Sequence, residues 1–434
     1  MPASSTVVLS PNHVQSNAER PRWAAWIHRH RVSIALLCLL IGIVGGFPVG
    51  RRIGFQQAAM RRRELPNGSF LCKPGPWGDL SYTPFTISAP ESILPLASLE
   101  AAGTHWFFKG YTLESFTTLL QSTSLSPEQQ QALTTPAVLH AGPDGVELDP
   151  TPDMVISLPD DARERFYEIL AAIPENASQF DYFPANSLAD RFSPETGVSA
   201  DTVALFKHLS VLRDNYVVFS GLSVLLSRVE GDAEKLHLLK ALTTQRTLTL
   251  RLHITPETDA TALTEYWGRG VWNTDVQTIL QSLTTIPNGT WISILMVLPP
   301  APTAQLYDYP SPANNAPAGA PANADGNWTS LNFFRDVSNP DFANPQSAME
   351  EVRQNYFPST GDPRYGDLIV FTNPSGAIIH SAIYIADDIC YTKNGNNVFS
   401  PWMLTNIADV VARFSLQTPP DQPLTVGFYR SKSY

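Results

Sequence analysis

The segment from Tyr365 to Gly395 constrains the fold of this chain more than any other. It contains three runs of β-branched and aromatic residues separated by two turn sequences. The runs are Asp367–Phe371, Ile378–Ala386 and Ile389–Thr392, and the turns are Asn373-Pro374-Ser375-Gly376 and Asp387-Asp388. Such a pattern predicts three antiparallel strands joined by tight turns, with His380 on the middle strand.

The turn at Asp387-Asp388 decides which residue faces His380 on the next strand. A two-residue turn places Gly395 opposite His380 and puts Cys390 on the other face of the sheet. We then interpret Cys390 as a small buried hydrophobic residue. A three-residue turn shifts the register by one and brings Asn394 opposite His380 instead. The sequence leaves both registers open.

These strands resemble a known family. Tyr365-Gly366-Asp367-Leu368-Ile369-Val370-Phe371, followed by His380-Ser381-Ala382-Ile383-Tyr384-Ile385, is similar to the NlpC/P60 group of papain-like cysteine peptidases and amidases. The resemblance implies a papain-like α+β domain with an antiparallel sheet over residues 327–434. It further implies a cysteine nucleophile on a helix and a histidine base that a polar residue orients. His380 would be the base, and Asn394, Thr392 or Lys393 the orienting residue.

The resemblance places the nucleophile within Asp325–Phe334, and this segment has no cysteine. The whole chain has three, Cys38, Cys72 and Cys390. Thr329 and Ser330 are the hydroxyl candidates, although a hydroxyl is less acidic than a thiol and needs a stronger base and oxyanion site.

The missing sulfur favours a pseudoenzyme of the cell envelope that binds or regulates. The alternative is an active cell-wall peptide hydrolase, amidase or acyl transferase that combines His380 with an unrecognised nucleophile. Peptidoglycan peptides are the partner that the resemblance implies.

Residues 32–50 contain nineteen residues without a charge, flanked by arginines on both sides. This length and composition predict a transmembrane helix that contacts membrane lipid. Together with the resemblance, it predicts a single-pass membrane protein whose body is extracytoplasmic, in the periplasm of a two-membrane bacterium.

Charge is distributed unevenly along the chain. Residues 1–63 hold nine Arg and one Glu, a net charge of +8, so the remaining 20 Lys and Arg against 39 Asp and Glu give −19. An acidic body is not typical of a nucleic-acid-binding protein. The histidines and cysteines show no metal-ligand spacing, and we expect neither a metal nor a cofactor. The oligomeric state does not follow from the sequence.

The pattern along the chain predicts an α+β protein. Its predicted parts are a basic segment (1–31), the transmembrane helix (32–50), a connector (51–97), an α+β domain of unknown function (98–300), a Pro/Ala/Asn-rich linker (301–326) and the NlpC/P60-like domain (327–434). Within the α+β domain, Thr247–Ile254 alternates strictly between apolar and other residues. It predicts a half-buried strand with its leucines and isoleucine turned inward.

Overall fold

The computed structural model describes residues 64–65, 67–269, 275–310, 320–321, 323–397, 399–418 and 422–433. The predicted transmembrane segment, residues 32–50, lies outside these ranges. Within them, no helix is long and apolar enough to cross a membrane. The two longest described helices, α7 (Asp160–Ala171) and α11 (Asp232–Thr243), have 12 residues each. They span about 18 Å, against a hydrocarbon core of about 30 Å. This finding contradicts the transmembrane part of the predicted fold and the single-pass localisation.

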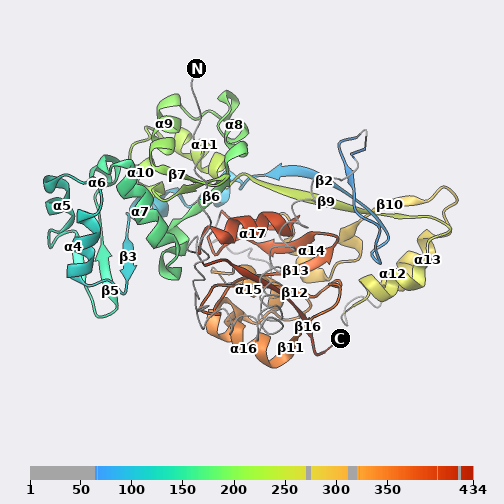
Figure 1. Ribbon diagram of the computed structural model, residues 1–434. Coiled ribbons are helices and arrows are strands. Elements are labelled where there is room, and N and C mark those ends of the chain that lie inside the picture. Colours follow the sequence, from blue (N-terminus) through green and yellow to red (C-terminus); the bar gives the residue numbers. More distant parts are fainter. Residues whose placement is uncertain are drawn as a thin grey trace, which may run out of the picture. The chain divides into compact units, whose positions relative to one another are not determined.

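A long antiparallel ribbon joins two parts of the fold (Figure 1). Strand β2 (Asp79–Ile87) pairs along its whole length with β9 (Gln245–Ile254). Strands β1 (Phe70–Leu71) and β10 (Thr290–Ser293) complete a four-stranded sheet in the order β1-β2-β9-β10. The predicted strand within β9 is confirmed, because its inward residues Leu248, Leu250, Leu252 and Ile254 are at most 4% exposed.

Residues 88–244, between β2 and β9, form an inserted subdomain with a hydrophobic core of its own. Its two three-stranded sheets have the orders β3-β5-β4 and β6-β8-β7. The strands are β3 (Trp106–Lys109), β4 (Leu139–Ala141), β5 (Gly145–Leu148), β6 (Asp181–Pro184), β7 (Ser210–Arg213) and β8 (Tyr216–Phe219). Besides α7 and α11, its helices are α3 (Leu96–Ala101), α4 (Leu113–Gln121), α5 (Pro127–Leu133), α6 (Pro152–Ser157), α8 (Leu188–Arg191), α9 (Ala200–His208) and α10 (Leu222–Leu226).

The inserted subdomain divides the chain differently from the predicted 98–300 domain. Leu250 and Trp267 lie in the same buried cluster as Trp328 and Tyr365, which belong to the C-terminal part. Residues 245–300 therefore contribute to the C-terminal core. The inserted subdomain begins after Ile87 of β2 and ends before Gln245 of β9, which pair with each other at one end of the ribbon.

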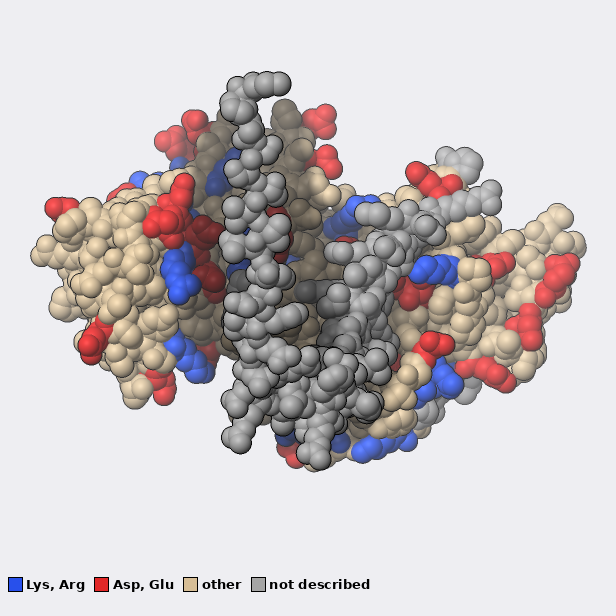
Figure 2. Space-filling model, viewed as in Figure 1, with Lys and Arg blue, Asp and Glu red and all other residues tan. Residues whose placement is uncertain are grey.

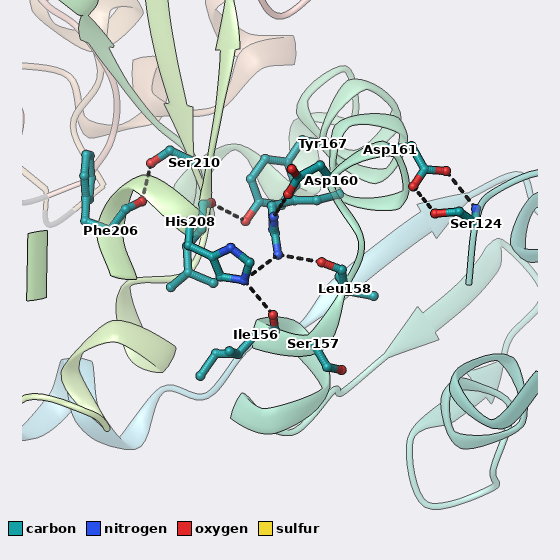
Figure 3. Close-up of polar contacts among 12 residues, drawn as sticks. Ser124, Ile156, Ser157, Leu158, Asp160, Asp161, Tyr167, Phe206, His208 and Ser210 are labelled. Atoms are coloured by element: carbon teal, nitrogen blue, oxygen red, sulfur yellow. Dashed lines mark hydrogen bonds and ion pairs between the residues drawn. The ribbon is translucent and has the colours of Figure 1, made fainter. Parts of the chain in front are cut away.

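Helix α7 is fixed in the inserted subdomain by polar groups that find backbone partners (Figure 3). The buried Tyr167 hydroxyl donates to the Leu209 carbonyl at 3.0 Å and also contacts the Ser220 carbonyl. Burial raises the pKa of Tyr167, so the hydroxyl keeps its proton and remains a donor. At the start of the helix, Asp161 accepts a hydrogen bond from the Ser124 amide. The Tyr167 bonds attach α7 to the segments that flank β7 and β8, and the Asp161 bond attaches it to the loop between α4 and α5.

The C-terminal part contains a six-stranded antiparallel sheet in the order β11-β16-β12-β13-β14-β15. Its strands are β11 (Tyr356–Pro358), β12 (Leu368–Thr372), β13 (Ile378–Ala386), β14 (Ile389–Lys393), β15 (Trp402–Asn406) and β16 (Thr425–Ser431). Its helices are α15 (Gly326–Leu331), α16 (Pro345–Asn355) and α17 (Ile407–Ser415), and the preceding chain adds α12 (Ala260–Trp267), α13 (Val276–Leu283) and α14 (Pro300–Gln305).

Helices α15 and α17 cover opposite faces of this sheet. Trp328 and Leu331 of α15 share a hydrophobic cluster with Ile383 and Ile385 of β13. Phe414 of α17 shares a different cluster with Tyr384. The predicted papain-like region is thus a mixed α+β unit with an antiparallel sheet between two helices.

A β-bulge sets the register around His380. Tyr384 pairs with Cys390, but Ala386 pairs with Ile389, and the register shifts between them. Continued along β13, the Tyr384–Cys390 register places Asn394 opposite His380, which is the three-residue-turn alternative. Cys390 consequently lies on the same face as Tyr384, and the expectation that it occupies the opposite face from His380 is wrong. It still lies about 13 Å along the sheet from His380, at about 3.3 Å per residue, and is no partner for the ring.

The surface carries both signs of charge. On the face drawn in Figure 2, acidic side chains are interspersed with basic ones. On this face, the acidic excess of the sequence beyond residue 63 is spread over the surface rather than gathered in one patch.

Candidate functional site

His380 lies at the centre of the candidate site and is almost completely buried, at 2% exposure. Its ring stacks on Phe414 of α17, with ring centroids 4.0 Å apart and an interplanar angle of 15°. Phe371 of β12 contacts it from a second side. Burial lowers the pKa of His380 well below its usual range, and the nearby charge of Arg413 acts in the same direction. The imidazole is therefore neutral at physiological pH.

Thr392 on β14 is the polar partner of His380. Its Oγ1 lies 2.9 Å from Nε2 of the ring. The same hydroxyl donates to Oδ1 of Asn394 at 3.5 Å, the long end of the hydrogen-bond range. With the proton on Nε2, the three groups form one chain of donors and acceptors, and Nδ1 carries the free lone pair. The structure thus brings the predicted residues His380 and Asn394 together through Thr392.

Gly326, the first residue of α15, lies against the other edge of the His380 ring. A Cβ added to Gly326 would lie 2.1 Å from Cε1 and 2.4 Å from Nδ1 of His380. Asp325 immediately precedes it and caps the helix by accepting a hydrogen bond from the Trp328 amide at 2.9 Å. A side chain at position 326 would point at the His380 ring, and glycine is the residue that has none.

The two predicted hydroxyl nucleophiles are not brought to His380. Oγ1 of Thr329 donates to the Asp325 carbonyl at 2.6 Å and accepts from the Trp402 indole at 3.0 Å. Oγ of Ser330 lies 2.7 Å from Oγ of Ser381. Neither hydroxyl is hydrogen-bonded to His380 among the described contacts, and both residues are only 2% exposed. Their bonds attach α15 to the sheet and to Trp402.

Sequence reasoning missed Gly326, although the predicted nucleophile segment included it. The available signal was a glycine directly after a helix-capping aspartate. Only the close approach of the His380 ring explains why a glycine occupies that position.

Lys393 and Asp325 form a second buried group on the α15 side of the sheet. The fully buried Lys393 Nζ donates to the carbonyls of Gly395 at 2.6 Å and Asn397 at 3.1 Å. Burial lowers the pKa of Lys393 to about 7, although the nearby Asp325 opposes this shift. Burial also raises the pKa of Asp325 to about 6. Lys393 thus binds backbone carbonyls of the chain that follows β14. Among the described contacts it makes no hydrogen bond to His380.

Asp367, in the Gly-Asp-Leu sequence, is a buried structural anchor. Its carboxylate accepts from Nε of Arg430 at 2.9 Å and from Nη2 at 2.7 Å. Arg269 Nη1 lies 3.5 Å away, and the Arg364 amide donates at 2.9 Å. The preceding Gly366 has φ +85°, and a Cβ there would lie 2.5 Å from the Phe334 ring. The motif therefore fixes the start of β12.

The described residues contain no group of three or more His, Cys, Asp or Glu side chains that could hold a metal ion. The buried Cys390 is a free thiol, so it forms no disulfide with Cys72. Burial raises the pKa of the Cys390 thiol, which keeps it protonated and unreactive.

Comparison of the chain with models of protein families, with curated proteins and with solved structures found no match. The similarity to the NlpC/P60 group therefore remains a prediction from the sequence.

The Gly326 contact yields a direct prediction. Replacing Gly326 with alanine is expected to lower the free energy of unfolding by about 1–3 kcal/mol, because the new methyl group overlaps the His380 ring in a packed core. Denaturant unfolding of the two proteins measures this difference. Gly361→Ala is the matched control, since a Cβ there meets nothing within 4 Å. Equal stability of Gly326→Ala and the control would contradict the close approach.

Proposed function

We propose that this protein is a non-catalytic member of the papain-like, NlpC/P60-type class, in which a closed former active site serves binding or regulation. One observation carries this proposal. The helix position that faces Nδ1 of His380 is Gly326, so this position supplies no side-chain sulfur or oxygen for the ring to activate. A base without an adjacent nucleophile cannot perform covalent acyl transfer.

The surroundings of the ring support the same reading. The ring of Phe414 stacks on the imidazole, and His380 is only 2% exposed, so solvent hardly reaches the ring. The hydroxyls of Thr329 and Ser330 are engaged with the Asp325 carbonyl and with Ser381, respectively.

A second candidate function is an active hydrolase or acyl transferase. One observation favours it: Thr392 hydrogen-bonds to the His380 ring and donates in turn to Asn394, and a working base requires such an oriented ring. This candidate needs a nucleophile or activated water that reaches Nδ1 from beyond Gly326.

The two candidates make different predictions for turnover. We expect the purified full-length protein to release no product from peptidoglycan peptides or from generic ester and amide substrates above the level of its His380→Ala variant. Mass spectrometry of the reaction mixtures measures this. Calorimetry with the same wall peptides tests binding in parallel, and binding without turnover is the expected result for a pseudoenzyme. Product formation that disappears in His380→Ala would instead establish the active candidate.

A further inference from the structure

The inserted subdomain is joined to the rest of the fold by only two chain segments within the described residues, one after β2 and one before β9. A small group of hydrogen bonds links these two connecting segments to each other and to Tyr309. The Tyr309 hydroxyl lies 2.7 Å from the Thr243 carbonyl and 3.2 Å from the Ile87 carbonyl. The Thr243 hydroxyl accepts from the Ala89 amide at 3.1 Å. Two adjacent connecting segments that are joined by only a few hydrogen bonds are typical of a hinge between two parts of a fold.

Away from this hinge, the inserted subdomain makes polar contacts with the elements that enclose His380. Asp181 of β6 accepts from the Asn397 side-chain amide at 3.3 Å. Arg413 of α17 donates to the Tyr182 carbonyl at 3.2 Å, and its guanidinium lies over the Tyr182 ring at 5.3 Å. Arg213 of β7 donates to the Leu416 carbonyl at 3.2 Å.

Apolar packing accompanies these bonds. Phe399 and Leu416, which follow β14 and α17, are buried in the hydrophobic core of the inserted subdomain. They are 6% and 4% exposed. The docking contact therefore combines buried apolar surface with hydrogen bonds.

The two segments that contact the inserted subdomain, α17 and the chain after β14, also adjoin residues that contact His380. Phe414, whose ring stacks on the imidazole, is the next residue after Arg413. Asn397 lies in the loop that begins at Asn394, directly after Thr392 and Lys393. Loss of the docking contact would release the stacked ring and the loop that follows the polar partner of His380.

We infer that the inserted subdomain is a hinged lid, which closes the site by docking on α17, on residues 394–397 and on Phe399, and that a ligand of this site must displace it. The inference concerns access to His380 and goes beyond the proposed function, because it holds whether or not the site has lost its chemistry. Burial raises the pKa of the Asp181 carboxyl in this contact, and the nearby Arg413 partly offsets the effect.

The test measures how fast diethyl pyrocarbonate, which carbethoxylates accessible imidazoles, modifies His380 in the full-length chain. In the wild-type protein we expect His380 to be protected, while His140, whose side chain is 51% exposed, reacts and serves as the internal standard. Asp181→Ala is expected to raise the His380 rate at least tenfold relative to His140. Asp153→Ala is the matched control, since this subdomain carboxylate pairs with Arg228 but is 87% exposed, and it should leave His380 protected.

A second variant guards against simple unfolding. Tyr309→Phe removes only the hinge hydroxyl and should raise the His380 rate while the circular dichroism spectrum stays unchanged. Amide hydrogen exchange should quicken in α17 and in residues 394–397 and remain slow in α7. Continued protection of His380 in folded Asp181→Ala and Tyr309→Phe would overturn the inference. So would labelling that rises only together with exchange throughout the subdomain.

Discussion

Replacing Asp367 with alanine is expected to lower the free energy of unfolding by about 3–5 kcal/mol, the usual result of removing one partner from a buried ion pair. The carboxylate is 1% exposed, and its loss leaves Arg430 and Arg269 near each other without a counter-charge. The Arg364 amide also loses its acceptor. Urea unfolding at neutral pH, followed by circular dichroism, measures the change.

The exposed pair Asp153–Arg228 provides the control for Asp367. Asp153→Ala should change the stability by less than about 1 kcal/mol, as expected for a solvated ion pair. The double variant Asp367→Ala, Arg430→Ala should be less destabilised than the sum of the two single variants. A loss below about 1 kcal/mol in Asp367→Ala would contradict the anchoring role of the Gly-Asp-Leu sequence.

The second large effect is a rise in stability with pH that depends on Lys393. Because burial lowers the pKa of Lys393 from 10.5 to about 7, the unfolded chain binds more protons than the folded chain between these values. The free energy of unfolding should therefore increase as the pH rises through this window, by up to about 5 kcal/mol. Below pH 7 the contribution is unfavourable and constant, since both states are protonated.

Lys393→Met isolates this effect from other titrating groups. Methionine has a similar unbranched shape but no titratable group, so the difference between the wild-type and variant curves belongs to Lys393. Urea unfolding at intervals from pH 7 to 9.5 should show wild-type stability rising relative to the variant. Parallel curves would show that the Lys393 ammonium is not destabilised by its burial.

Local patterns predicted the strands of this protein better than their partners. Alternation in β9 identified its buried face, because one side of a strand packs on a core whichever strand is its neighbour. Its main partner, β2, lies about 160 residues earlier, and the inserted subdomain separates the two. Such pairing depends on contacts that no local pattern encodes, so the predicted 98–300 domain combined residues of two separate cores.

In the candidate site, too, the sequence did not predict which residues contact each other across distant segments. The family resemblance named Asn394, Thr392 or Lys393 as the orienting residue of His380. The strand pattern left Gly395 or Asn394 opposite His380, because the bulge between Tyr384 and Ala386 depends on packing. Thr329 and Ser330 were candidate nucleophiles because of their hydroxyls. In the structure, these hydroxyls contact Trp402 and Ser381, which lie in distant segments of the chain. Gly326 gave no chemical signal, since its importance lies in the side chain that it lacks.

We propose that no nucleophile acts with His380. Intact-mass analysis of the full-length protein after exposure to serine-directed and cysteine-directed acylating probes tests it most directly, with the His380→Ala variant treated in parallel. The account predicts no adduct in the wild-type protein beyond those formed equally in the variant. A stoichiometric adduct that maps to Thr329, Ser330 or another residue near Gly326 and disappears in His380→Ala would contradict it and establish an active enzyme.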